Sequence, residues 1–110
     1  MAPTTVSRFD LWWANLDPTM GHEIRKTRPV LIVSPDELNR HLGTVLAAPL
    51  TSTIRPYPFR VHTVVSEIPG QVALDQIRAL DKARLIRRMA SLSQEARREV
   101  LAVLQLMFAE

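Results

Sequence analysis

The chain has 110 residues, 46% apolar and 23% charged, which predicts one folded domain over residues 1–110 with a substantial hydrophobic core. The net charge is only +3, but twelve of the fourteen cationic residues are arginine, whose planar guanidinium binds phosphate and carboxylate groups. The chain has no cysteine, no apolar run of membrane-spanning length and no hydrophobic signal core near its N-terminus. Disulfides and thiolate chemistry are therefore excluded, and we expect a cytoplasmic protein without a membrane partner.

The first residues predict a frayed end followed by a strand. Residues 1–7 are polar, and we expect them to fray. Residues 9–13 form the first expected strand, which places Trp12 on the face opposite to Leu11 and Trp13. Trp12 therefore needs its own cover. Packing within the chain is the more frequent solution, and a second subunit is the alternative.

A second strand and a short helix follow. Residues 30–33 are apolar on both faces, which indicates a central strand. Ser34 as N-cap, Pro35 at the first helical position and Glu37 at the third form an expected capping box. We expect this helix to end near Gly43, which suits a C-terminal cap.

The middle of the chain predicts a series of short strands. Residues 44–50 form a third strand, interrupted near its end by a proline that removes a ladder donor. Residues 59–65 alternate between apolar and polar, which predicts a strand whose other face, including Arg60, is exposed. Residues 69–70 give a turn signal, and residues 72–80 predict a further strand or a bent pair of strands.

The last third predicts a helix after an ambiguous segment. Residues 83–90 fit either a short strand or an irregular crossing. Ser93 caps a helix with one apolar face, formed by Ala96, Val100, Leu101, Leu104, Met107 and Phe108. Together these elements predict a mainly β fold of the α+β class. It is a small antiparallel β-barrel with a short helix after the second strand and a C-terminal amphipathic helix.

The stretch between Asp17 and Pro35 has the features of a functional site. Its polar loop ends in Arg25, Lys26 and Arg28, and three cations in four positions attract anions. The histidines lack metal-ligand spacing and the glycines form no phosphate loop, so we expect no metal and no other cofactor. Arginine, hydroxyl, histidine and carboxylate groups at strand ends suit phosphoryl transfer without a metal.

Several short motifs then occur in one order along almost the whole chain. They are Asp17-Pro18-Thr19, Gly21-His22-Glu23, Arg28-Pro29-Val30, Ser34-Pro35, residues 48–53, Tyr57-Pro58-Phe59 and residues 75–81. Each motif alone is weak, but in this order and spacing they resemble the MazF/PemK (Kid) family of toxin endoribonucleases.

This resemblance implies an SH3-like β-barrel of the CcdB/MazF kind that assembles as a homodimer. It also implies metal-independent, sequence-selective cleavage of single-stranded RNA, including mRNA, to 2′,3′-cyclic phosphate and 5′-hydroxyl ends. The cognate antitoxin would carry an acidic, partly disordered C-terminal tail that covers the RNA site. An arginine-rich groove suits both guests, because both are polyanions.

The resemblance also implies roles for individual residues. Arg28 matches the catalytic arginine, which binds the scissile phosphate as the RNA 2′-hydroxyl attacks. Thr51 matches the catalytic threonine, which holds a phosphate oxygen with help from Ser52. The remaining positions expected to bind RNA or line the site are His22, Glu23, Arg25, Asp75, Gln76 and Arg78.

Departures from the family pattern affect the loop and the acid–base chemistry. In the Kid branch the histidine and aspartate matched by His22 and Asp75 act together with an arginine, and Ala73 stands at that arginine's position. The Kid version of the chemistry therefore does not carry over intact. Ile24 and Lys26 replace a common glutamine and glycine, which predicts a stiffer and more basic loop with an altered RNA preference.

Structural interpretations of the same residues remain open at this point. Arg28 could be a strand-edge arginine paired with Glu23 or Asp17, Thr51 could cap a turn, and Asp75 could belong to a salt bridge. The chain as a whole could instead be a CcdB-like toxin that poisons DNA gyrase through its C-terminal helix. Residues 106–110 lack the Trp-Gly-Ile ending associated with that branch. A degenerate member that only binds antitoxin is a third possibility.

Overall fold

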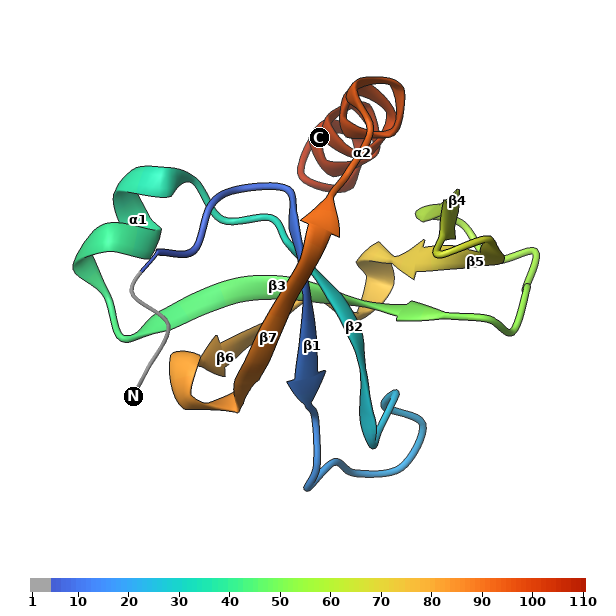
Figure 1. Cartoon of the computed structure of the whole chain (residues 1–110). Helices are drawn as coiled ribbons and strands as arrows, with labels where there is room; N and C mark the ends of the chain where they lie inside the picture. Colours follow the sequence, from blue (N-terminus) through green and yellow to red (C-terminus); the bar gives the residue numbers. More distant parts are fainter. Residues whose placement is uncertain (1–4) are drawn as a thin grey trace.

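The computed structural model describes residues 5–110 and shows a curled antiparallel sheet with two helices (Figure 1). The strands are β1 (Asp10–Asn15), β2 (Thr27–Ile32), β3 (Thr44–Thr51), β4 (Arg60–Val65), β5 (Ile68–Ala73), β6 (Arg78–Asp81) and β7 (Leu85–Ser91). The α-helices are α1 (Asp36–His41) and α2 (Gln94–Met107), and the short 3-10 turns are η1 (Leu74–Gln76) and η2 (Lys82–Arg84).

The sheet curls into a half-barrel. Its strands follow the order β4-β5-β3-β2-β1-β7, with β6 also paired to β3, and β4 and β7 form its two ends. The predicted small antiparallel barrel with a short helix after its second strand and a C-terminal helix is therefore confirmed, in an open form. None of the helices in residues 5–110 has the length and apolar character needed to cross a bilayer.

Alternating side chains of β1 and β2 fill two separate hydrophobic clusters. Leu11 and Leu31 belong to the cluster under α2, whereas Trp12 and Val30 belong to the second cluster. The prediction that β2 is central is confirmed, because its apolar residues are buried on both faces. Trp12 is 5% exposed and packs within the chain, which was the more frequent of the two arrangements considered for this side chain.

Strand β3 pairs with three other strands and changes partner at its end. Its pairing with β2 ends where Pro49 lies opposite Val30, and its pairing with β5 starts at the next residue, Leu50. A proline at this switch point costs little, because the ladder it would interrupt has already ended.

The segment after residue 68 is the bent strand pair that the sequence allowed. Both β5 and β6 run antiparallel to β3, with Val72 opposite Leu50 and Arg78 opposite Ala47. The three-residue interval from Ala47 to Leu50 on β3 therefore lies opposite the six-residue interval from Val72 to Arg78. The extra residues of the longer segment form η1. This bulge carries Asp75 and Gln76 out of the sheet.

The capping box predicted for α1 is wrong. Pro35, not Ser34, is the N-cap residue, and no side chain caps this helix. The Ser34 hydroxyl donates to Asn39 Oδ1 at 2.5 Å and accepts from the Leu46 amide at 3.0 Å, so its oxygen ties the helix to β3 instead. The helix ends at His41 with Leu42 as its C-cap residue, which agrees with the expected end near Gly43.

The turn predicted at residues 69–70 is also misplaced, because both residues lie within β5. The turn is formed by Ser66 and Glu67, whose φ angles of 51° and 66° match the two-residue hairpin that favours right-handed strand twist. Gly70 serves close packing: a Cβ there would lie 2.6 Å from the Thr51 carbonyl oxygen.

The two ends of the chain differ from expectation in part. Residues 1–4 of the segment expected to fray lie outside the described residues, whereas Val6 is buried in the second hydrophobic cluster. The ambiguous segment before α2 forms η2 and β7. Ser93 caps α2 as predicted, accepting from the Ala96 amide at 3.2 Å. Phe108 lies beyond the helix and is 78% exposed, so its placement on the apolar face is wrong.

We predict that Gly70→Ala destabilises the protein by about 1–3 kcal/mol, because the new methyl group forces β5 away from β3. Urea unfolding of the variant measures this loss. Gly43→Ala is the matched control, since a Cβ at Gly43 meets no atom within 4 Å. Equal stability of the two variants would show that the close approach at Thr51 is unimportant.

Candidate active site

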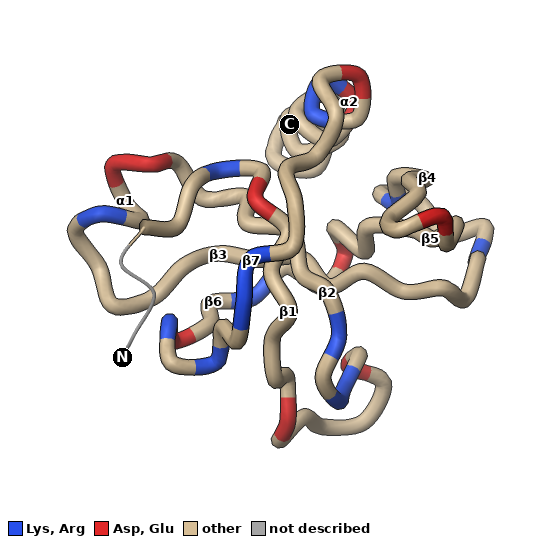
Figure 2. The backbone as a smooth tube through the Cα atoms, in the orientation of Figure 1, with Lys and Arg blue, Asp and Glu red and all other residues tan. Residues whose placement is uncertain are grey.

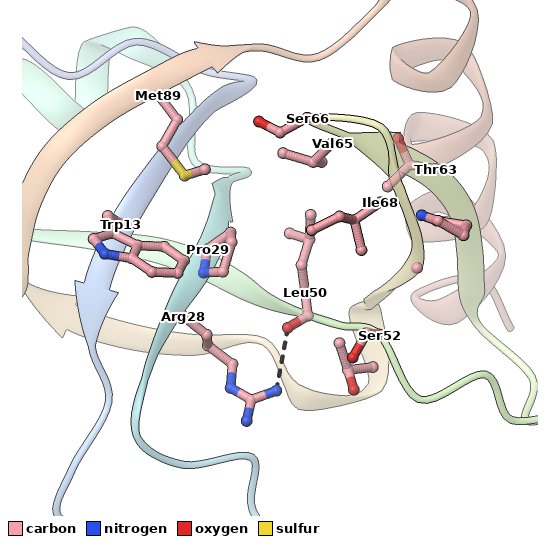
Figure 3. Close-up of a pocket in the computed structure, with 13 residues that line it drawn as sticks. Trp13, Arg28, Pro29, Leu50, Ser52, Thr63, Val65, Ser66, Ile68 and Met89 are labelled. Carbon is pink, nitrogen blue, oxygen red and sulfur yellow. Dashed lines mark hydrogen bonds between the residues drawn. The ribbon is translucent and has the colours of Figure 1, made fainter.

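Arg28 lies near the start of β2 and reaches toward the end of β3. Its Nε donates to the Arg25 carbonyl at 2.9 Å and its Nη1 to the Leu50 carbonyl at 3.4 Å (Figure 3). Partial burial lowers the pKa of this guanidinium through desolvation, although arginine stays cationic in proteins. The two hydrogen bonds hold the guanidinium beside Leu50, the residue that precedes Thr51.

The charge of Arg28 is not cancelled by a carboxylate. Within residues 5–110 the ion pairs are Arg60–Asp75 and Arg88–Asp10. The alternative pairing of Arg28 with Glu23 or Asp17 is therefore absent from the described chain. A partly buried guanidinium without a carboxylate partner is a strong anion-binding group, because no counter-charge from the described residues competes for it.

Thr51 is the last residue of β3 and caps the turn that follows. Its Oγ1 accepts from the Thr53 amide at 3.1 Å, so the turn-capping interpretation is correct. Capping uses a lone pair of the oxygen and leaves the hydroxyl proton free to donate. The structural contact therefore orients Thr51 as a donor, and the two interpretations are compatible.

Arg28, Thr51 and Ser52 line one cavity of about 360 Å³. Figure 3 shows Arg28 and Ser52 on the same side of this cavity. The opposite side of this cavity is largely apolar, formed by residues of β1, β2, β3, β5 and β7 and of the β4–β5 hairpin: Trp13, Pro29, Leu50, Val65, Ile68 and Met89. We call this the first cavity. It combines an apolar wall with a guanidinium and the hydroxyl groups of Thr51, Ser52, Thr63 and Ser66, which suits a ligand with both a flat ring and an anionic group.

All but one of the other predicted residues line a second cavity of about 380 Å³. Its polar lining contains five of them, namely His22, Glu23, Asp75, Gln76 and Arg78. Pro49 lines this second cavity and Leu50 the first, so the two cavities adjoin consecutive residues of β3. Arg25 lines neither cavity, and its Nη2 donates to the Gly21 carbonyl at 3.1 Å.

Cationic residues gather around this end of the sheet. Figure 2 shows one group at the start of β2 and another on β7 and the turn before it. Their members are Arg25, Lys26 and Arg28 in the first group and Lys82, Arg84, Arg87 and Arg88 in the second. Among residues 5–110, no cluster of three histidine, aspartate or glutamate side chains is arranged to hold a metal ion.

Comparison with known proteins identifies the family. Residues 7–108 match the family model described as PemK-like, MazF-like toxin of type II toxin-antitoxin system. The chain belongs to this family. Endoribonuclease EndoA of Bacillus subtilis (strain 168) is 32% identical, over 94% of this chain and 95% of that protein.

Solved structures with the same fold include MazF from Deinococcus radiodurans. It superposes with a TM-score of 0.81 at 31% identity and covers 97% of this chain and 96% of its own. An endoribonuclease in complex with its cognate antitoxin, from a Mycobacterial species, gives a TM-score of 0.80 at 26% identity, with 96% and 99% of the two chains covered.

In this MazF-like toxin, several residues of the second cavity hold the β1–β2 loop in place. Gln76 Oε1 accepts from the Ile24 amide at 2.7 Å, and Glu23 Oε1 accepts from the Met20 amide at 2.6 Å. Arg78 Nη1 donates to the Leu16 carbonyl at 3.3 Å. These three side chains therefore have a structural task besides any contact with a ligand.

Sequence reasoning missed the residues that support the site from behind. Arg84 donates from η2 to the carbonyls of Asn15, at 3.2 Å, and Asp17, and so fixes the base of the β1–β2 loop. Gln71 lies 1% exposed opposite Thr51 on β5. Arg60 was expected to face solvent, yet its side chain is only 6% exposed. Polar residues on an alternating strand give no signal that their partners lie in distant segments.

We predict that Gln76→Ala releases the β1–β2 loop locally. Loss of one hydrogen bond costs about 1 kcal/mol, so amide exchange at Ile24 should become roughly fivefold faster, while exchange in the β1–β2 ladder stays unchanged. Gln105→Ala, on the exposed face of α2, is the matched control. Unchanged exchange at Ile24 in the Gln76 variant would show that this contact does not hold the loop.

Proposed function

We propose that this toxin is a metal-independent endoribonuclease that cuts single-stranded RNA, including mRNA, at short sequences and thereby inhibits translation and growth. One observation carries the proposal: β2 and β3 bring the uncompensated guanidinium of Arg28 and the free hydroxyl proton of Thr51 to the rim of one cavity. A relative 32% identical over 94% of the chain bears the name endoribonuclease.

In the proposed reaction the RNA 2′-oxygen attacks the adjacent phosphorus. The 2′-hydroxyl gives up its proton to solvent water as the new bond forms. The bond from phosphorus to the 5′-oxygen breaks, and the 5′-oxygen takes a proton from solvent water, which leaves a 2′,3′-cyclic phosphate and a 5′-hydroxyl. Negative charge builds on the two non-bridging phosphate oxygens as the attack proceeds. Arg28 donates to one of them and Thr51 to the other, and Ser52 assists.

This arrangement stabilises charge with donors that are already in place. Arg28 is fixed by the carbonyls of Arg25 and Leu50, and Thr51 by the Thr53 amide, so neither group has to reorganise during the reaction. Preorganised donors supply the electrostatic stabilisation that a metal ion provides in other nucleases.

The second cavity suits the RNA on one side of the scissile phosphate. His22, Glu23, Gln76 and Arg78 offer both acceptors and donors to base edges, sugar hydroxyls or phosphate. Arg25 and Lys26 follow Ile24, which lines this cavity, and their charges attract the polyanion. We assign these residues to RNA binding, not to bond breaking.

The partners follow from the same surface. The solved complexes of related toxins hold an antitoxin, and we propose that this chain binds a cognate antitoxin through an acidic, partly disordered C-terminal tail. A tail of that kind competes with RNA for the same cations. We further propose a single toxin domain that works as a homodimer in the cytoplasm.

A CcdB-like gyrase poison of similar fold is not favoured. The family match over residues 7–108 is with MazF-like and PemK-like toxins, and the proposed nuclease groups come together in one cavity. DNA breaks that depend on gyrase, together with intact RNA, would reverse this ranking.

We predict that Arg28→Ala lowers the rate of cleavage of single-stranded RNA in EDTA by at least about 10²-fold, because it removes the main donor to the transition state. Gel assays under single-turnover conditions measure the rate, and circular dichroism checks the fold. Arg98→Ala, at an exposed position of α2, is the matched control and should cleave normally. Equal activity of the two variants would remove Arg28 from the mechanism.

We also predict that the hydroxyl of Thr51 is required. Thr51→Val should reduce cleavage by about 10²-fold, and Thr51→Ser should retain most of it, because serine keeps the donor. Replacement of the 2′-hydroxyl by hydrogen at the cut site should stop cleavage by every variant. Cleavage of that substrate at the normal rate would exclude attack by the 2′-oxygen.

A further inference from the structure

Arg60 is the most completely enclosed cation for which the structure gives an ion pair. Its Nε lies 2.6 Å from Asp75 Oδ1 and its Nη2 lies 3.2 Å from Asp75 Oδ2, so the guanidinium and the carboxylate meet through two parallel hydrogen bonds. The Arg60 side chain is 6% exposed, whereas that of Asp75 is 34% exposed. The carboxylate thus faces the second cavity, and the arginine supports it from behind.

The same guanidinium reaches the loop that follows Thr51. Arg60 Nη1 donates to Gln71 Oε1 at 3.3 Å, and its guanidinium carbon lies 4.9 Å from the centre of the Tyr57 ring. Gln71 is buried and binds both backbone groups of Arg55, accepting from its amide at 3.1 Å and donating to its carbonyl at 2.9 Å. Arg60 therefore contacts β5, the β3–β4 loop and η1 at once.

These contacts link the two cavities into one supported surface. On one side the β3–β4 loop begins directly after Thr51, and Gln71 holds this loop at Arg55. On the other side η1 presents Asp75 and, next to it, Gln76, which holds the β1–β2 loop through the Ile24 amide. A fixed distance between these loops is what a substrate spanning both cavities requires.

The pair also neutralises one of the two carboxylates that line the second cavity. A free carboxylate at Asp75 would repel an RNA backbone, whereas a carboxylate bound by two guanidinium donors presents almost no net charge. Both of its oxygens already accept hydrogen bonds from Arg60, so the carboxylate is engaged in holding the guanidinium.

We propose that Arg60 is a positioning residue that neutralises Asp75 in the wall of the RNA site and fixes η1 relative to the loop after Thr51. In this arrangement Asp75 holds Arg60 and takes no part in proton transfer. The inference rests on the proposed endoribonuclease function and assigns the support of its substrate site.

The test measures RNA binding and cleavage separately in four proteins: wild type, Arg60→Met, Asp75→Asn and the double variant. The binding probe is a single-stranded RNA with a 2′-deoxy residue at the cut site, and cleavage uses the matching all-RNA strand in EDTA. Arg60→Met should weaken binding by about tenfold at low salt, because it leaves Asp75 uncompensated.

The double variant provides the discriminating result. Removing the carboxylate as well should restore binding to within about threefold of wild type, because no unpaired charge remains. Asp75→Asn alone should keep cleavage within about tenfold of wild type and leave its pH profile unchanged, whereas loss of a general base costs about 10²–10⁴. Arg60→Lys, which keeps the charge without the planar fork, should bind better than Arg60→Met.

Two results would overturn the inference while the proposed function stands. One is a double variant that binds RNA as weakly as Arg60→Met. The other is an Asp75→Asn variant that binds RNA normally but loses cleavage together with one limb of the pH profile. A wild-type protein that neither binds nor cuts RNA would remove the proposed function and the inference with it.

Discussion

The antiparallel pairing of β3 with β2, β5 and β6 is the interaction on which the rest of this toxin depends (Figure 1). Its partners change at Pro49, so the strand ends outside the β2 ladder and delivers Thr51 to a cavity rim. The register of its pairing with β2 also sets the position of Arg28 along the sheet, so that the Arg28 guanidinium reaches the Leu50 carbonyl. The register of paired strands therefore brings Arg28 and Thr51 together, and paired strands hold side chains more rigidly than a loop does.

Two arginines of this site show how environment separates binding from support. Among residues 5–110, Arg28 donates hydrogen bonds to two carbonyl oxygens and forms no ion pair, so its charge remains available to an anion. Arg60 lies behind the site with its charge cancelled by Asp75. The sequence matched Arg28 to the family's catalytic arginine and placed Arg60 only on an exposed strand face. The structure adds that, within the described chain, a carboxylate lies beside Arg60 and none pairs with Arg28.

The sequence predicted elements with strong local signals and missed features that depend on distant partners. Periodicity located β1, β2 and α2, because hydrophobic periodicity is a local signal. Short motifs singled out Arg28 and Thr51 as candidates, and the structure brings the two to one cavity. The η1 bulge, the Ser34 contact with β3 and the burial of Arg60 depend on residues far along the chain. The Pro69-Gly70 turn failed for the same reason: Gly70 is needed for close approach to Thr51, not for bending.

The most direct test of this account is the chemistry of the ends produced on a long single-stranded RNA in EDTA. Enzymatic and mass-spectrometric mapping of the fragments reports both terminal groups at every cut. A site built from Arg28 and Thr51 predicts 2′,3′-cyclic phosphate and 5′-hydroxyl ends at one recurring short sequence. Fragments with 3′-hydroxyl and 5′-phosphate ends, or cleavage only after a divalent metal is added, would contradict it.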